Sequence, residues 1–339
     1  MKLKKIDITG LWHEYNLTWN LNEDVNILVG GNGAGKTTIF DLVCSTIPPY
    51  RMEKNLIRKA DKIKLVFEDD YSIQCINFRD SFLSLKERAQ DDPSYKTLLE
   101  EVSEDVGERH NSHLDFGIFA TLTQFFHEGK QIKSTELEDL VRLSVISTFD
   151  APLPKQEDES SSFKELSEER PMSHLDKKLF DCMENYSYYI GSLANKIEQH
   201  VLNGNEVTTE FVHDVYSQKH LFGQIMNELF AESGKKIDIS KSKPDFVLKS
   251  GKHISMYDLS SGEKQVFYIM LRILLQEKHD YIVFMDEPEL SLHVDWQEKL
   301  IDKIQQLNPN CQLIIATHSP SLLFNGWDSK VANIEKLKH

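Results

Sequence analysis

The stretch Gly30-Gly-Asn-Gly-Ala-Gly35-Lys36-Thr37 decides the fold of this 339-residue chain. It fits the pattern GxxxxGK[ST] and follows the apolar run Val25–Val29, which predicts a buried strand that leads through the loop into a helix. Glycines at these positions let backbone N–H groups surround phosphate oxygens, so the pattern predicts a nucleotide-binding loop. Lys36 would reach the β- and γ-phosphates, and the Thr37 hydroxyl would bind Mg²⁺. The residues predicted to hold the nucleotide in this loop are Asn32, Gly33, Ala34, Gly35, Lys36, Thr37 and Thr38.

Two acidic residues near the other end of the chain supply the second half of such a site. Asp286 and Glu287 follow the apolar run Tyr281–Met285, which predicts a buried strand. A carboxylate at a strand end can hold Mg²⁺ or its waters, the role predicted for Asp286, and a neighbouring carboxylate can polarise the attacking water. Two acids after a strand could also mark where it meets solvent. Together with the glycine-rich loop, the active-site interpretation is the stronger.

Three further motifs make a family resemblance specific. Leu259-Ser260-Ser261-Gly262-Glu263-Lys264-Gln265 resembles the ABC signature, with Ser261 where glycine is usual and Glu263 where transporters usually have glutamine. Glu287-Pro-Glu-Leu-Ser-Leu-His293 is similar to the segment that runs from the catalytic glutamate into the D-loop, and Ala316-Thr-His318-Ser-Pro320 is similar to the switch-histidine segment. The ordered set resembles ABC-class ATPases of the OLD, RecF and SMC-like branch.

The resemblance implies roles that spacing alone does not show. Ser260, Ser261 and Gly262 would face the γ-phosphate held by a second copy of the chain, because the positive end of their helix attracts anions. Glu287 would act as general base, His318 would contact the γ-phosphate, and Lys36 would assist catalysis. The cofactors implied are ATP and Mg²⁺, and the assembly implied is a homodimer or higher homo-oligomer that shares its ATP sites. A hydrogen-bonded core histidine remains the alternative for His318.

The wording of the motifs also suggests a biological setting. Glu-Pro-Glu-Leu-Ser-Leu-His and Ala-Thr-His-Ser-Pro are typical of the OLD-like AAA ATPases of bacterial antiphage modules such as Septu, retron-associated and PARIS systems. Some relatives attach a TOPRIM nuclease after the ATPase, but the chain ends soon after His318, so we expect a separate nuclease or toxin as effector. A RecF-like DNA-repair ATPase and the ATP-binding subunit of a transporter stay open as alternatives.

The expected fold is α/β: a P-loop NTPase of ABC type, with a mixed, largely parallel sheet flanked by helices. Residues 1–80 and 235–339 should form the ATPase core, with 140–150 returning to it. Residues 81–139 should be an irregular acidic and helical insertion, with helical patches around 96–106 and 134–143, and 151–162 should contain an exposed break. Within the core, the β-rich runs 62–67 and 71–78 predict a hairpin, and a helix is expected from about Val294 to Leu307. Within 151–234, apolar residues at helical spacing from Leu175 to Val201 and again from Phe211 to Leu229 predict a helical hairpin lobe.

Composition and charge limit the partners and the cellular location that the chain can be expected to have. The formal charge of −15 argues against general nucleic-acid adhesion, although DNA stays open as a partner through a local basic groove. The sequence shows neither a membrane-spanning run nor a secretion signal, so we expect a cytoplasmic protein without membrane contact. Two details stay open. Gln124 and Gln156 are both candidates for a magnesium-sensing glutamine, and Trp12 or Tyr15 could stack on adenine or could instead pack in the core.

Overall fold

A computed structural model describes residues 1–48, 59–77, 121–147, 172–241, 243–323 and 326–339. The chain divides into two compact units. The first comprises Met1–Leu143 with Ala332–His339, and the second comprises Ser144–Val331. Each unit is described by itself below.

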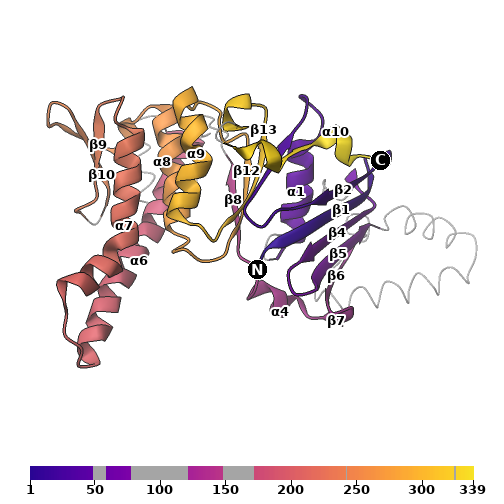
Figure 1. Cartoon of the computed structure of the whole chain (residues 1–339), viewed down its shortest axis with the longest axis horizontal. Coiled ribbons are helices and arrows are strands. Elements are labelled where there is room, and N and C mark those ends of the chain that lie inside the picture. Colours follow the sequence, from indigo (N-terminus) through magenta and orange to yellow (C-terminus); the bar gives the residue numbers. More distant parts are fainter. Residues whose placement is uncertain (49–58, 78–120, 148–171, 242, 324–325) are drawn as a thin grey trace, which may run out of the picture. The chain divides into compact units, whose positions relative to one another are not determined.

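The first unit is built on an antiparallel sheet with the strand order β2-β1-β4-β5-β6-β7 (Figure 1). Its alternating sequence explains the pleat: Leu3, Ile6, Ile8 and Leu11 on β1 are buried, whereas the residues between them are more exposed. Helix α1 contacts β4 of this sheet. The elements of the unit are β1 (Leu3–Leu11), β2 (Tyr15–Asn20), β3 (Val25–Val29), α1 (Lys36–Thr46), β4 (Lys62–Phe67), β5 (Tyr71–Asn77), β6 (Thr121–His127), β7 (Lys130–Ile132), α4 (Ser134–Glu138) and α10 (Ile334–Leu337).

The second unit contains the parallel pair β12–β13, with β8 on the other side of β12. Helices α8 and α9 pack on each other, and α6 and α7 both contact α8. A small sheet, in the order β11-β10-β9, follows the second hairpin helix. The elements are β8 (Leu143–Ser147), α6 (His174–Leu202), α7 (Thr209–Leu229), β9 (Lys235–Asp238), β10 (Asp245–Leu248), β11 (His253–Ile254), η2 (Met256–Asp258), α8 (Ser261–Leu274), β12 (Ile282–Asp286), α9 (Val294–Leu307), β13 (Gln312–Thr317), η3 (Pro320–Leu323) and η4 (Trp327–Lys330). Strand β14 (Val331–Asn333) includes the last residue of the second unit and the first two residues of the C-terminal part of the first.

Aromatic side chains fill the core of the second unit where α7, α8 and β10 meet. Phe246 lies edge-on to Phe267 at a centroid distance of 5.1 Å, and Phe222 and Phe230 contact the same pair. All four side chains are fully buried. Such rings bury large apolar areas and favour edge-on geometry, so they anchor the base of the hairpin to α8.

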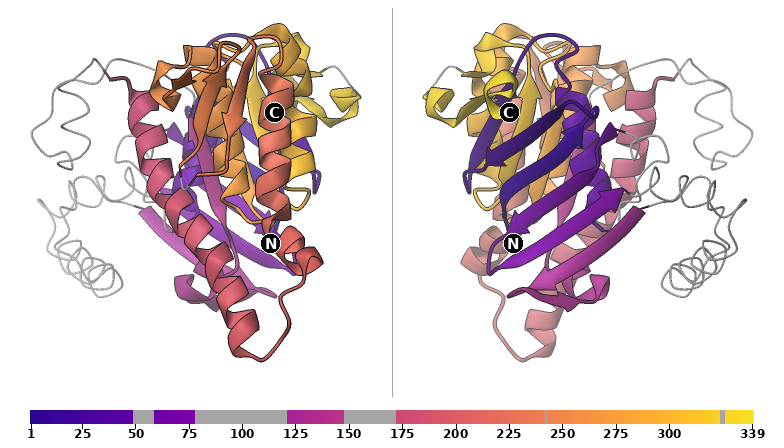
Figure 2. Two further views of the ribbon diagram at one scale, coloured as in Figure 1. Left: turned by 90° about the vertical axis from the view of Figure 1, so that its left-hand side faces the viewer. Right: turned by 90° about the vertical axis from the view of Figure 1, so that its right-hand side faces the viewer.

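The helical hairpin predicted from the apolar stripe is confirmed as α6 and α7 (Figures 1 and 2). Ser173 caps α6 through a reciprocal pair with Asp176, and the Thr208 hydroxyl accepts from the Phe211 N–H to cap α7. Among the described helices, none is long and apolar enough to cross a membrane.

Other expectations are confirmed or corrected element by element. The predicted hairpin of 62–67 and 71–78 is β4 and β5, and the predicted helix from Val294 to Leu307 is α9. The helical patch expected over 134–143 is shorter, because α4 ends at Glu138. Residues 121–132, expected within an irregular insertion, instead form β6 and β7 and extend the first sheet. Gln156, the helical patch at 96–106 and the exposed break at 151–162 lie outside the described residues.

Candidate nucleotide site

The phosphate-binding loop of the first unit leads from β3 into α1. Gly33 and Gly35 adopt positive φ angles of 76° and 99°, which side-chain-bearing residues rarely tolerate. Gly35 is the N-cap of α1, and no side chain within the described part of the chain caps that helix. A helix start without a side-chain cap is a common place for an anion to bind. A Cβ on Gly35 would also overlap the ring of Trp12, which lies against the loop.

Lys36 lies folded over the loop that it belongs to. Its side chain is buried, and Nζ donates to the carbonyl oxygens of Gly30 at 3.1 Å and Gly31 at 3.4 Å. Carbonyl oxygens are weaker partners for an ammonium group than phosphate oxygens, because a charged acceptor strengthens the bond. The ammonium group therefore lies at the loop that the sequence predicts to bind phosphate.

A cavity of about 580 Å³ lies beside the loop. Lys338 Nζ lies 5.5 Å from the ring centroid of Trp12 and 5.1 Å from that of Tyr15, so the C-terminal segment contributes a cation–π contact to the cavity wall. The cavity wall combines aromatic, charged and backbone groups, a mixture that suits the base and ribose of a nucleotide. The cavity is lined by Trp12, Tyr15, Gly31, Asn32, Gly33, Ala34, Glu335 and Lys338.

The catalytic candidates of the second unit lie side by side. His318 Nε2 is 3.2 Å from Glu287 Oε1, and both side chains are partly exposed. Glu287 follows β12 with a left-handed φ of 46°, and its N–H donates to the Ala316 carbonyl at 2.8 Å, continuing the β12–β13 pairing. Non-glycine residues in this conformation cluster at functional sites, where the surroundings hold them in place. The core-histidine alternative for His318 is not what this geometry shows.

Sequence reasoning missed Glu289, which holds the loop of His318. Its Oε1 accepts from the Thr317 hydroxyl at 2.5 Å, from the His318 N–H at 3.0 Å and from the Ser319 N–H at 3.2 Å. The side chain is only 8% exposed. A buried carboxylate with three donors fixes the loop firmly, because leaving it unpaired would be costly. Its place two residues after Glu287 was the available signal.

The signature segment opens helix α8. Ser260 is an exposed N-cap whose hydroxyl accepts from the Glu263 N–H and donates to Glu263 Oε2 at 3.0 Å. Gly262 is buried against the segment 287–293, here called the D-loop, since a Cβ there would overlap the carbonyl oxygen of Ser291. A glycine is therefore required where α8 and the D-loop touch, and the exposed Ser260 and Ser261 lie beside that contact.

The Glu263 carboxylate at the start of α8 is stabilised by hydrogen bonds that outweigh the effect of burial. Burial alone would raise the pKa of the Glu263 carboxyl, but hydrogen bonds from Lys235 and from the Ser260 N–H hold that pKa below its usual range. The Lys235 Nζ lies 2.7 Å from Glu263 Oε1. Glu263, unusual for a signature segment in transporters, thus has a structural partner in β9.

Comparison with known proteins identifies the family of the chain. The model of the family described as "AAA domain, putative AbiEii toxin, Type IV TA system" matches residues 25–323. The chain belongs to this AAA-domain family. It is 22% identical to "Retron Vc95 probable ATPase" of Vibrio cholerae, covering 94% of the chain and 70% of that protein. It is 23% identical to "Septu protein PtuA" of Bacillus thuringiensis, covering 95% of the chain and 72% of that protein.

A solved structure supports the fold. An SMC head bound to the C-winged helix domain of ScpA superposes with a TM-score of 0.54 at 12% identity, covering 98% of this chain and 94% of that one. The predicted ABC-type P-loop fold is therefore confirmed. The family match and the retron and Septu relatives confirm the predicted resemblance to the AAA ATPases of antiphage modules.

The predicted site residues of this AAA-domain protein belong to both units. Lys36, Thr37 and Thr38 belong to the first, and Asp286, Glu287 and His318 belong to the second. Thr37 and Asp286 offer a hydroxyl and a carboxylate, the hard oxygen donors that Mg²⁺ prefers. Gln124 lies in the middle of β6 opposite Gln74, and nothing in that position identifies it as a magnesium sensor.

Proposed function

We propose that this AAA-domain protein hydrolyses ATP with Mg²⁺ and is the nucleotide-gated regulatory subunit of an antiphage defence system, with a separate nuclease or toxin as effector. The Glu287–His318 pair carries the proposal. The carboxylate and the imidazole lie 3.2 Å apart, and the buried carboxylate of Glu289 fixes the loop of His318. A protein that bound nucleotide without hydrolysing it would not need this arrangement. The retron and Septu relatives support the setting. The cytoplasm stays the predicted location.

These residues would transfer a proton from the attacking water and neutralise the charge of the phosphates. The Glu287 carboxylate would accept a proton from the attacking water, and a proton on His318 Nε2 would orient that carboxylate by a hydrogen bond. The N–H groups of the first turn of α1 and the Lys36 ammonium would bind the phosphate oxygens. Mg²⁺, held through Thr37 and Asp286, would supply neutralisation of triphosphate charge.

The gating part of the proposal requires a second copy. The Ser260 hydroxyl and the N-terminal N–H groups of α8 would bind the γ-phosphate on the partner subunit, so ATP would join two chains and hydrolysis would release them. The exposure of Ser260 and Ser261 supports this role. Ser260 would have to turn its hydroxyl away from Glu263, with which it now exchanges two hydrogen bonds.

Three variants test the proposal. Glu287→Gln should keep ATP binding, abolish turnover and shift the protein to the associated form, measured by phosphate release and by light-scattering mass with and without Mg-ATP. Lys36→Ala should weaken ATP binding itself, and Ser260→Arg should bind ATP without associating. Turnover of Glu287→Gln at the wild-type rate would show that the base is wrongly assigned, and an ATP-independent mass would refute gating. Turnover stimulated by DNA in a salt-sensitive way would favour the RecF-like alternative.

A further inference from the structure

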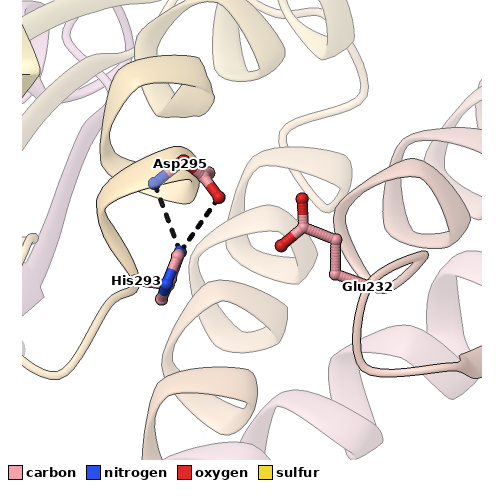
Figure 3. A group of neighbouring side chains, drawn as sticks. All are labelled: Glu232, His293 and Asp295. Atoms are coloured by element: carbon pink, nitrogen blue, oxygen red, sulfur yellow. Dashed lines mark hydrogen bonds and ion pairs between the residues drawn. The ribbon is translucent and has the colours of Figure 1, made fainter.

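A second set of polar side chains converges in the second unit, where α7 ends and α9 begins. Glu232 lies in the turn after α7, His293 is the N-cap of α9, and Asp295 is in the first turn of α9 (Figure 3). One ring nitrogen of His293 and one carboxylate oxygen from each acid all lie within 4.8 Å of one another. The donors thus come from two segments that are far apart in the sequence.

The scaffold beneath these donors is fixed. The indole Nε1 of Trp296 donates to the Leu229 carbonyl at 2.8 Å, and the Phe230 and Trp296 rings pack at a centroid distance of 5.9 Å. The last turn of α7 is therefore tied to the first turn of α9 directly beside Glu232 and Asp295. A metal site needs this kind of support, because its ligands must be held close to their final geometry.

The electrostatics of the cluster favour a cation. His293 Nδ1 accepts the Asp295 N–H at 3.4 Å in capping α9, yet the same nitrogen faces Asp295 Oδ2 at 3.2 Å. In the tautomer that carries its proton on Nε2, His293 Nδ1 has a lone pair that can bind a metal ion. Figure 3 shows the Glu232 carboxylate turned toward this pair. Two carboxylates and an imidazole nitrogen thus face one space, and a cation there relieves the repulsion between the carboxylates.

We propose that Glu232, His293 and Asp295 bind a divalent transition-metal ion, for which Zn²⁺ is the best chemical match. Zn²⁺ binds both imidazole nitrogen and carboxylate oxygen, and three protein ligands leave its fourth position to water, whereas Mg²⁺ and Ca²⁺ prefer oxygen ligands alone. The His293 and Asp295 side chains are 65% and 45% exposed, so they can rotate inward to reach bonding distance. This site is separate from the Mg²⁺ assigned to Thr37 and Asp286.

The bound ion would link the hairpin to the D-loop. Glu232 follows the second hairpin helix, and His293 ends the segment whose Ser291 carbonyl packs on Gly262 of α8. A metal bridge would therefore restrain the D-loop against α8 and raise the thermal stability of the chain. That effect requires no nucleotide, so it can be measured apart from ATP hydrolysis.

The test uses tag-free, chelator-treated protein without nucleotide, titrated with ZnCl₂ by calorimetry and by competition with a zinc-binding dye. The wild type should bind one zinc ion per chain and melt at a higher temperature with zinc. Glu232→Gln and Asp295→Asn should each weaken zinc binding at least about tenfold, as even loss of an outer-shell partner does, and should lose the rise in melting temperature.

Asp245→Asn is the matched control. Asp245 Oδ2 lies 2.7 Å from His253 Nδ1 and 3.2 Å from Lys241 Nζ, but within the described chain no third metal-ligating group joins Asp245 and His253. This variant should bind zinc as the wild type does. Equal zinc affinity of Glu232→Gln and wild type, the absence of stoichiometric zinc binding, or displacement of zinc by millimolar Mg²⁺ would each overturn the site.

Discussion

Lys264 in the first turns of α8 forms an ion pair with Asp176 in the first turn of α6, with Nζ and Oδ1 2.8 Å apart. The two side chains are only 14% and 4% exposed. Asp176 also closes the cap of α6 by accepting from the Ser173 N–H at 3.0 Å. The base of the hairpin is therefore bonded directly to the helix that begins with the signature serine.

Removing one partner of this pair should be costly. Asp176→Asn keeps the size of the side chain and an oxygen for the cap but leaves the Lys264 charge buried without its partner. We expect the free energy of unfolding to fall by roughly 3–5 kcal/mol, the usual cost of breaking a buried pair, measured by urea denaturation. The matched control is Asp181→Asn, which breaks the exposed pair with Lys177 on the same helix and should cost less than about 1 kcal/mol. Equal losses for both variants would show that the buried pair has no special role.

Acid should weaken the start of α8 through Glu263. Its folded-state pKa is lowered, so the unfolded chain binds the proton more tightly and stability rises with pH. The contribution is complete above the ordinary glutamate value of 4.5 and is lost as the pH falls through the lower folded-state pKa. Glu263→Gln should lower the melting temperature at neutral pH and flatten its decline below about pH 4.5.

Melting curves recorded from pH 7 to pH 3 check this prediction. Glu138→Gln, on the exposed end of α4, is the control and should keep the wild-type slope. A Glu263→Gln protein that loses stability with acid as steeply as the wild type would contradict the assignment.

Glu289 should act as a positioning residue for His318. Glu289→Ala removes the acceptor of the Thr317 hydroxyl and of two backbone N–H groups, so the loop can shift by an ångström or more. We expect turnover to fall on the order of 100-fold, the usual cost of such misplacement, with ATP affinity nearly unchanged. Glu289→Gln keeps one oxygen acceptor and should restore much of the activity.

The comparison of kcat with KM separates this role from general destabilisation. A structural defect would reduce the fraction of active protein in both Glu289 variants according to their stability. A positioning role predicts rescue by glutamine at equal melting temperature. If Glu289→Ala turns over ATP as fast as the wild type, the loop does not depend on this carboxylate.

Much of the fold could be predicted because it follows local rules. The apolar steps from Leu175 onward predicted α6, and the amphipathic pattern of Val294–Leu307 predicted α9 with its observed bounds. Strand β6 escaped prediction because its partner β5 is more than forty residues away and an acidic stretch separates them. Long-range pairing leaves little trace in the sequence nearby.

The candidate site likewise divides into residues that local spacing predicts and residues whose roles depend on distant contacts. The glycine-rich loop, Asp286, Glu287 and His318 carry recognisable spacing, so they could be named from the sequence. The roles of Glu289 and Lys338 do not follow from spacing, because they arise from contacts with loops elsewhere in the chain. Glu289 binds the segment after β13, and Lys338 reaches Trp12 and Tyr15 from the C-terminal end.

Trp12 should contribute to nucleotide binding as a wall of the cavity beside the phosphate loop. Its ring touches Gly35 and lies under the Lys338 cation, so the residue both shapes the loop and offers an aromatic surface to a base. Stacking of a base on an aromatic ring contributes about 1–3 kcal/mol, so Trp12→Ala should weaken ATP binding by roughly 5- to 150-fold. Trp12→Phe should keep most of the affinity. Fluorescent ATP titration checks both variants, with inorganic triphosphate as a competitor: if stacking is the cause, triphosphate should bind Trp12→Ala as well as it binds the wild type, whereas a parallel loss of triphosphate affinity would show that Trp12 supports only the loop.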